Sequence, residues 1–258
     1  MWQLISFLKY LYASKGPNRV HSPFVFELYT EAILPNKNFY RTEALDKLRE
    51  ELLNDHAVIT QENPGAGSKK LNRYSTTVAS VAKISGSPLK YSRLLLRLAD
   101  RFKPAATLEL GTSLGIATMH LAAAHPLGKV ITLEGNPETA AFARKNFKKA
   151  GLTNVELIEG LFSETLPSAL QKLTKLDLVF LDGDHRKEPA LNYIRQMLPH
   201  FHNDSLLIMD DIHWSKEMEE AWEEVKQLPE VTVTIDLYRM GLVFFRKEQV
   251  REHFILRF

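Results

Sequence analysis

The chain has 258 residues, of which 45% are hydrophobic and 25% charged, with a net charge of +2 and no cysteine. This length allows one large domain with a smaller extension, or two small domains. The lack of cysteine excludes disulfides, Cys-ligated zinc, iron–sulfur clusters and thiol catalysis, and the small net charge gives no support to nucleic-acid binding.

The charge is distributed unevenly, with a net +7 in residues 1–105 and a net −5 in residues 106–258. A basic front part could attract an acidic substrate, an acidic partner or a lipid headgroup, and solvated helix faces are the plainer explanation. The hydrophobic opening Met1–Ala13 is interrupted by Lys9. It is too short to span a bilayer and lacks the pattern of a secretion signal. We therefore expect a cytoplasmic protein without a transmembrane segment.

The first 84 residues predict a helical extension. Apolar residues at helical spacing predict an amphipathic helix before Gly16-Pro17, which packs on the body of the protein or on a second subunit. A homodimer through the N-terminal helices is thus one prediction, and a membrane-surface role is another, although the polar face carries little basic charge. Helices are also predicted at Phe24–Ile33 and Thr42–Asn54. The stretch Gln61–Ser75 is rich in Gly, Lys and Asn and predicts a mobile loop, with a lid as one interpretation.

From Pro88 onward, strand and helix patterns alternate. The predicted strands are Ala106–Leu110, Lys129–Glu134, Val155–Glu159, Leu176–Leu181, Ser205–Met209, Val231–Leu237 and Leu242–Arg246, and the predicted helices are Tyr91–Phe102, Ile116–His125, Glu138–Ala150, Ser163–Leu173, Glu188–Phe201 and Ser215–Gln227. Such alternation predicts a doubly wound α/β fold with helices on both faces of a mostly parallel sheet. The sheet has seven strands, and the tight last connection makes the C-terminal strand antiparallel. We expect residues 85–258 to form this domain and residues 1–84 to form the extension.

An open α/β sheet binds its ligand beyond the carboxyl ends of its strands, so the residues that follow each strand are the candidates for a site. The first strand is followed by a turn in which Gly111 and Gly115 allow sharp bending and close approach of a ligand to the main chain. Thr112 and Ser113 lie in this turn, and Glu109 just before it suits a ligand with an ammonium group. The spacing G-x-x-x-G differs from the G-x-G-x-x-G dinucleotide fingerprint, which weakens a nicotinamide interpretation.

The second and third strands end at residues suited to a nucleoside. The Glu134 carboxylate can accept both hydroxyls of a ribose, in NAD and in S-adenosylmethionine equally, and a surface glutamate near a helix start is the alternative. Gly160 and Phe162 could hold a flat adenine at the next strand end, or Phe162 could be ordinary core.

Acidic residues follow the fourth and fifth strands. Asp182-Gly-Asp-His185 and Asp210-Asp211 should converge, because these strands are neighbours in the usual winding. Close carboxylates repel, so their pKa values rise or a cation lies between them. Oxygen ligands suit Mg²⁺, with Mn²⁺ or Ca²⁺ as substitutes. The alternative is that the aspartates only cap the helices that follow.

The segment LELGTSLGIATMHLA resembles the first motif of class I methyltransferases, most closely the branch of catechol and caffeoyl-coenzyme A O-methyltransferases, where E-x-G-T-x-x-G recurs. The resemblance covers about residues 85–246 and implies a Rossmann-like fold. The acidic pairs also resemble those of metal-dependent sugar O-methyltransferases. Residues 1–80 match neither branch closely.

The resemblance implies that S-adenosylmethionine lies across Glu109–Gly115, with Glu109 facing its ammonium group and Glu134 holding its ribose. It implies that the sulfonium methyl points toward Asp182, which is thereby both a cofactor-binding and a catalytic residue. It also implies a divalent metal on Asp182, Asp210 and Asp211, where Asp211 stands in place of the Asn of the branch. The branch has a catalytic Lys three residues after its first Asp, where this chain has His185. Since an imidazole ordinarily titrates near pH 6.5, His185 is the candidate base, with a solvated histidine as the alternative.

These residues predict methylation of a small hydroxylated acceptor assisted by a divalent metal. A non-catalytic S-adenosylmethionine-binding or interaction module is the alternative, because fold alone does not establish catalysis. An NAD-dependent oxidoreductase is less well supported, because its glycine fingerprint is absent.

Overall fold

The computed structural model describes residues 2–34, 42–64, 71–84, 86 and 88–258. By its internal contacts the chain divides into two compact units, each assembled from separate stretches of sequence. Unit 1 comprises Met1–Asn36, Pro104–Leu110 and Leu166–Phe258, and unit 2 comprises Lys37–Lys103 and Gly111–Thr165.

Unit 1 contains most of the strands. They are β3 (Ala106–Leu110), β6 (Leu176–Leu181), β7 (Phe201–Met209), β8 (Val233–Asp236), β9 (Gly241–Phe244) and β10 (Glu252–Ile255). Their order is β10-β8-β9-β7-β6-β3, and β9 runs antiparallel to both β7 and β8. The β3–β6, β6–β7 and β8–β10 pairs are parallel. The apolar run of β6 is almost wholly buried, as expected for a strand covered on both faces.

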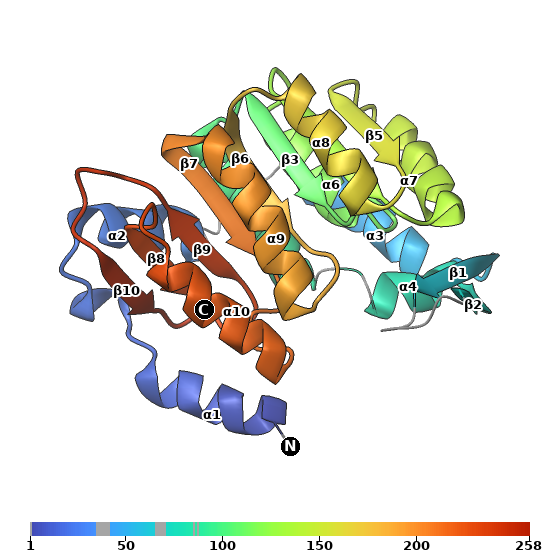
Figure 1. The fold of residues 1–258 in the computed structure, drawn as a ribbon. Helices are drawn as coiled ribbons and strands as arrows, with labels where there is room; N and C mark the ends of the chain where they lie inside the picture. The colour runs from blue at the N-terminus through green and yellow to red at the C-terminus, as the bar shows by residue number, and fades with distance from the viewer. Residues whose placement is uncertain (1, 35–41, 65–70, 85, 87) are drawn as a thin grey trace. The chain divides into compact units, whose positions relative to one another are not determined.

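The helices of unit 1 come from both ends of the chain (Figure 1). They are α1 (Trp2–Ala13), η1 (Pro17–Arg19), α2 (Pro23–Leu28), η2 (Tyr29–Ile33), α9 (Lys187–Met197), η4 (Leu198–His200) and α10 (Lys216–Gln227). Helix α8 (Phe162–Lys172) begins in unit 2 and continues into unit 1. Two serines cap helices, since the Ser22 hydroxyl accepts from Val25 N and the Ser215 hydroxyl accepts from Met218 N.

Unit 2 holds a parallel strand pair, a hairpin and five helices among its described residues. These are α3 (Glu43–Leu53), β1 (Val58–Pro64), β2 (Leu71–Thr77), α4 (Val78–Ile84), α5 (Leu89–Phe102), α6 (Ile116–Ala124), β4 (Lys129–Glu134), α7 (Pro137–Lys149) and β5 (Val155–Glu159). β4 pairs with β5 in parallel, and Asn136 caps α7 by accepting from Glu138 N and Thr139 N.

The predicted fold class is confirmed: the protein is an α/β Rossmann-like mixed sheet with an N-terminal helical region. The prediction of a loop at 61–75 is wrong for most of that stretch, because β1 and β2 pair as an antiparallel hairpin from Val58↔Thr77 to Pro64↔Leu71. Residues 65–70 lie outside the described residues. Strand β10 was not predicted, since it is short and follows a polar segment, and the predicted number of seven strands is wrong because β10 makes an eighth strand in the sheet. None of the helices in the described stretches has the length and apolar character needed to cross a membrane.

Candidate functional site

The turn after β3 is strongly bent and held by backbone hydrogen bonds. Gly111, Ser113 and Gly115 all have positive φ, at 105°, 48° and 83°. The N–H groups of Gly111 and Thr112 both donate to Leu133 O, each at 3.1 Å. The Thr112 and Thr132 hydroxyls lie 2.5 Å apart. The turn is therefore anchored to the end of β4, within unit 2.

Gly115 is required by packing as well as by its backbone conformation. A Cβ atom at this position would lie 2.5 Å from Cε1 of Phe147 in α7, which is closer than real Cβ contacts come. The first turn of α6 and the aromatic ring of Phe147 can meet only because residue 115 has no side chain. The glycine spacing seen in the sequence thus has a physical cause in this structure.

Glu134 joins the turn to the end of β4. Its Oε2 accepts from Ser113 N at 2.7 Å, and its Oε1 accepts from Asn136 N at 2.8 Å. Burial raises the pKa of Glu134, and these two N–H donors work against that rise by stabilising the charged form. The Thr139 side chain and the Gly135 backbone also hydrogen-bond this carboxylate and oppose the rise in the same way.

Gly160 and Phe162 lie next to this strand end. Gly160 has a φ of 141°, and its N–H donates to Glu134 O at 2.9 Å. Phe162 is the first residue of α8 and is partly exposed. The residues predicted to contact the ribose and the adenine therefore share one edge of unit 2. Glu109, the remaining predicted cofactor residue, lies in β3 of unit 1 and is fully buried.

The two acidic segments are brought together at one sheet edge in unit 1. β6 and β7 are parallel neighbours, with Leu181 opposite Met209. Asp182 N donates to Leu110 O at 2.9 Å, and Asp210 N donates to Leu181 O at 2.9 Å. Asp182 and Asp210 therefore follow strands that end side by side, as the predicted winding requires.

Among the described residues, Asp182, His185 and Asp211 form a group that could hold a metal ion. One ligand atom from each lies within 4.8 Å of the other two. His185 Nε2 is 3.9 Å from Asp182 Oδ1 and 3.8 Å from Asp211 Oδ2. These distances are too long for hydrogen bonds and leave space between the three side chains. Two carboxylates and an imidazole are ordinary ligands of divalent metals, so the residue set fits a cation.

Asp210 has a different partner. It is buried, with 1% of its surface exposed, and Arg239 from the β8–β9 connection holds both of its oxygens. Arg239 Nη2 donates to Asp210 Oδ2 at 2.9 Å, and Nε lies 3.5 Å from Asp211 Oδ1. The guanidinium neutralises Asp210, which is not one of the three residues of this group but hydrogen-bonds Asp182. Its role as a metal ligand stays a prediction.

The pKa values of the three aspartates and Arg239 are shifted by burial and by the charges of their neighbours. Burial raises the pKa of Asp182 well above its usual range, and the charges of Asp210 and Asp211 add to the rise. Burial and Asp210 also raise the pKa of Asp211, whereas Arg239 and His185 oppose this rise. Burial disfavours the charge on Arg239, but its bonds to Asp210 outweigh this and raise the pKa of Arg239. A divalent cation would reverse these costs by stabilising the ionised carboxylates.

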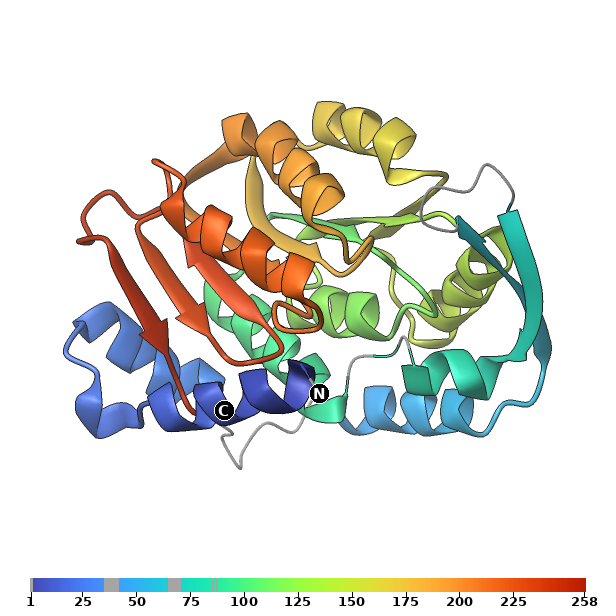
Figure 2. The ribbon, with the colours of Figure 1, turned by 60° about the horizontal axis from the view of Figure 1, so that its bottom comes forward.

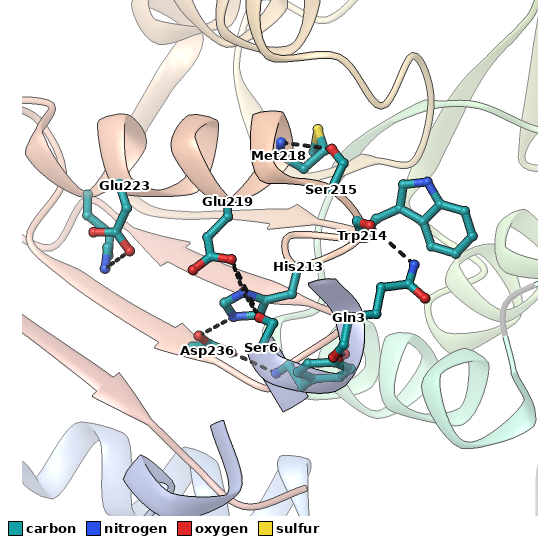
Figure 3. A network of polar contacts seen from close by, with 11 residues as sticks. Gln3, Ser6, His213, Trp214, Ser215, Met218, Glu219, Glu223 and Asp236 are labelled. Carbon is teal, nitrogen blue, oxygen red and sulfur yellow. Dashed lines mark hydrogen bonds and ion pairs between the residues drawn. The ribbon is translucent and has the colours of Figure 1, made fainter. Parts of the chain in front are cut away.

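Sequence reasoning missed Arg239 and the setting of His213. Arg239 is 28 residues beyond Asp211 in a connection without a recognisable motif. His213 Nε2 lies 2.8 Å from Asp236 Oδ2, and its Nδ1 lies 3.1 Å from Ser6 Oγ of α1 (Figure 3). No pattern in the sequence could have placed these residues together, because more than 200 positions separate Ser6 from His213.

Three comparisons bear on these residues. Residues 108–212 match the family described as "Methyltransferase domain". The chain is 34% identical over 141 residues to a catechol O-methyltransferase of Niastella koreensis, covering 54% of this chain and 62% of that protein. It is also 34% identical over 122 residues to a catechol O-methyltransferase of Mycobacterium tuberculosis, covering 46% of this chain and 54% of that protein. The chain thus spans little more than half the length of these curated relatives.

A solved structure shares the fold. The methyltransferase of Podospora anserina with bound S-adenosylhomocysteine superposes with a TM-score of 0.57 at 17% identity, covering 83% of this chain and 100% of that chain. At this identity the similarity supports the fold alone. The matched segment 108–212 includes the turn after β3, Glu134 and both acidic segments.

Proposed function

We propose that this chain is a class I S-adenosylmethionine-dependent methyltransferase of the catechol and caffeoyl-coenzyme A O-methyltransferase type, and that it methylates a hydroxyl group of a small acceptor; the match of residues 108–212 and the catechol O-methyltransferase relatives support this. The supporting observation is the bent turn at Gly111–Gly115, bonded to the Glu134 carboxylate. A catechol-like phenol is the acceptor class that the names of the relatives suggest.

The cofactor is proposed to be S-adenosylmethionine, bound through two groups of residues. Glu134 would hold the ribose, and the backbone of Gly111–Gly115 would approach the cofactor closely. Gly160 and Phe162 would flank the adenine. Buried Glu109 is assigned the ammonium group, since a buried carboxylate gains most from a cationic partner.

In the reaction, the C–S bond to the methyl group breaks as a C–O bond forms, and the acceptor hydroxyl loses its proton. Asp182, His185 and Asp211 would hold a divalent cation, with Mg²⁺, Mn²⁺ and Ca²⁺ as candidates, whose chemistry is to hold the acceptor oxygen and lower its pKa. As the alternative to this ligand role, with the cation held by the aspartates alone, His185 is proposed to accept the hydroxyl proton. Positioning of the acceptor supplies much of the rate in such an in-line displacement.

The first test is calorimetric titration with S-adenosylhomocysteine, the expected product. Wild-type protein should bind it, and Glu134→Ala should weaken binding at least tenfold, because the ribose loses its acceptor. The matched control is Glu159→Ala, since Glu159 lies opposite Glu134 in register but pairs with exposed Arg144. Absence of binding to folded wild-type protein would refute the cofactor assignment.

The metal assignment is tested separately by the melting temperature with and without Mn²⁺ or Mg²⁺. Asp182→Ala should abolish a metal-induced rise, whereas Asp184→Ala should retain it, because Arg186 already holds the Asp184 carboxylate. His185→Asn distinguishes its two roles: a ligand role predicts weaker metal binding, and a base role predicts unchanged metal binding with a lower kcat. Full activity with chelator present would refute the metal proposal.

A cytoplasmic location and a homodimer through the N-terminal helices stay predictions. Helix α1, whose ribbon is seen in Figure 2, is one of the helices that such a dimer would use.

A further inference from the structure

Helix α1 packs on unit 1 through polar and aromatic side chains, and the rings of Phe7 and Tyr10 contact the ring of Tyr238. Its buried residues are Ser6 and Tyr10. Surface helices of globular proteins normally bury an apolar stripe and present charged or polar residues to water. The inner and outer faces of α1 therefore need separate explanations.

The inner face is held by hydrogen bonds to distant parts of the chain. Ser6 Oγ contacts His213 Nδ1 at 3.1 Å, and Gln3 Nε2 donates to Trp214 O at 3.2 Å (Figure 3). The Tyr10 hydroxyl donates to Leu256 O at 2.6 Å. These contacts fix the rotation of the helix about its axis, so the opposite face points outward.

The outer face is apolar along the whole helix. The exposed side chains on it are Leu4 (64%), Ile5 (46%), Leu8 (57%), Leu11 (38%) and Tyr12 (95%). Their spacing of three and four residues places them in one stripe. Trp2 (39%) and Trp214 (57%) add two exposed indoles near the start of the helix. A contiguous apolar surface of this kind marks an interaction site.

The charge around this stripe is entirely basic in the N-terminal segment. Lys9, Lys15 and Arg19 are exposed, and the first acidic residue in the sequence is Glu27. Exposed Arg257 joins them, since its Nη2 donates to Leu11 O at 3.2 Å. On the inner side, the Ser6 hydroxyl donates to Glu219 Oε2 at 3.5 Å, and Asp236 is paired with His213.

We propose that α1 lies flat on an anionic phospholipid surface, with Leu4, Leu8 and Leu11 inserted among the acyl chains and the basic residues among the headgroups. A helix of 12 residues is about 18 Å long, which suits it to lie in the interface rather than to span a bilayer. Tryptophan and tyrosine are the side chains that membrane interfaces favour.

A lipid surface fits these observations better than a second copy of the chain does. Two copies pairing through α1 would bring two sets of Lys9, Lys15 and Arg257 together with no exposed acidic partner in this segment. A single short helix also offers much less area than the 800 Å² or so per partner of a standard stable interface. An anionic surface instead complements both the basic charge and the apolar stripe.

The test is co-sedimentation of the full chain with large vesicles of phosphatidylglycerol and phosphatidylcholine, and with vesicles of phosphatidylcholine alone. We expect binding to the anionic vesicles, at least tenfold weaker binding to the neutral ones, and weakening by salt. Leu4→Gln/Leu8→Gln should lower the partition coefficient at least tenfold. The matched control is Leu127→Gln, because Leu127 is 94% exposed and lies far from α1 in the sequence.

Folding and cofactor binding are checked in the same samples by melting temperature and by titration with S-adenosylhomocysteine. Both should match the wild type in every variant, which separates this proposal from the proposed enzymatic function. Sedimentation of wild type as a dimer that Leu4→Gln/Leu8→Gln converts to a monomer, without vesicle binding, would overturn the lipid proposal in favour of a second copy. Absence of vesicle binding by a monomer, or equal binding to neutral vesicles, would also overturn it.

Discussion

Asp210 and Asp211 are adjacent in the chain and both pair with Arg239, but Asp210 is held at 2.9 Å and Asp211 only at 3.5 Å. Arg239 holds both oxygens of buried Asp210, while Asp211 has a φ of 53° and faces His185. Asp tolerates this left-handed backbone conformation better than most residues do. Arg239 neutralises the Asp210 carboxylate, and the Asp211 carboxylate stays available to a cation.

Replacing Arg239 tests this division. Arg239→Met leaves buried Asp210 without its guanidinium, and we expect the free energy of unfolding to fall by about 3 kcal/mol, the lower end for breaking a buried pair, because Arg239 is itself partly exposed. The metal-induced rise in melting temperature should become larger, since Asp210 can then contribute. Urea unfolding with and without Mn²⁺ measures both. Arg246→Met breaks a more exposed pair with Glu248 and should lower the free energy of unfolding by less. Equal losses of stability in the two variants would contradict the pairing of Arg239 with buried Asp210.

Glu134 leads to a prediction about pH. Burial raises the pKa of Glu134, and only the carboxylate accepts both ribose hydroxyls. Affinity for S-adenosylhomocysteine should therefore be full at neutral pH and fall as the pH drops toward this raised pKa, above the usual value of 4.5. Calorimetry across this range on wild type and Glu134→Gln checks it, with circular dichroism as the control for folding. The Glu134→Gln variant should bind S-adenosylhomocysteine more weakly, and its affinity should not depend on pH. A wild-type affinity that stays unchanged down to pH 4.5 would contradict the role of Glu134 in holding the ribose.

At the scale of elements, the turn between β3 and α6 depends on two glycine requirements that can be separated. Gly115 needs both a positive φ of 83° and free space beside Phe147, whereas Gly151 after α7 has a φ of 68° and nothing within 4 Å of a built Cβ. Alanine at Gly115 and at Gly151 should therefore differ in stability by the cost of the steric contact with Phe147.

We expect Gly151→Ala to cost about 1–2 kcal/mol of stability from backbone strain. Gly115→Ala should cost a further 1–3 kcal/mol or so, because its Cβ overlaps the Phe147 ring. Phe147→Leu in the Gly115→Ala background should recover part of that second loss. Thermal unfolding of the variants measures the difference, and equal losses at both glycines would show that packing against Phe147 contributes nothing.

The hairpin β1–β2 shows why element prediction failed in residues 61–75. Strand pairing there is a property of two segments together, from Val58↔Thr77 to Pro64↔Leu71, and polar strands lack the apolar alternation that identifies a strand. The elements between β3 and β9 were easier, because apolar runs and glycines mark their ends.

At the scale of the whole molecule, the two ends of the chain are joined within unit 1. Lys15 N donates to Ile255 O at 2.8 Å, and Arg257 N donates to Lys15 O at 3.0 Å. The Tyr10 hydroxyl donates to Leu256 O and accepts from Phe258 N. Burial raises the pKa of Tyr10 to about 12, so this hydroxyl keeps its proton at neutral pH.

Removing that hydroxyl should loosen both ends. Tyr10→Phe leaves the Leu256 carbonyl without its donor, and we expect a loss of about 1–2 kcal/mol. Hydrogen exchange should rise in residues 2–13 and 252–258 together. Tyr12→Phe is the matched control, since Tyr12 is 95% exposed and should show neither effect. Increased hydrogen exchange in only one of the two segments would show that the Tyr10 hydroxyl does not link the two ends of the chain.

The sequence by itself determined the order of strands and helices from β3 to β9, the glycine turn, Glu134 at a strand end and the two acidic segments. These features arise from local chemistry, namely apolar runs, glycine conformations and residues placed directly after strands. Only the tertiary structure decided that Arg239 neutralises Asp210, that His185 faces Asp182 and Asp211, and that α1 turns its apolar side outward. These features depend on side chains far apart in the chain, and their positions follow from how the elements pack rather than from any local pattern.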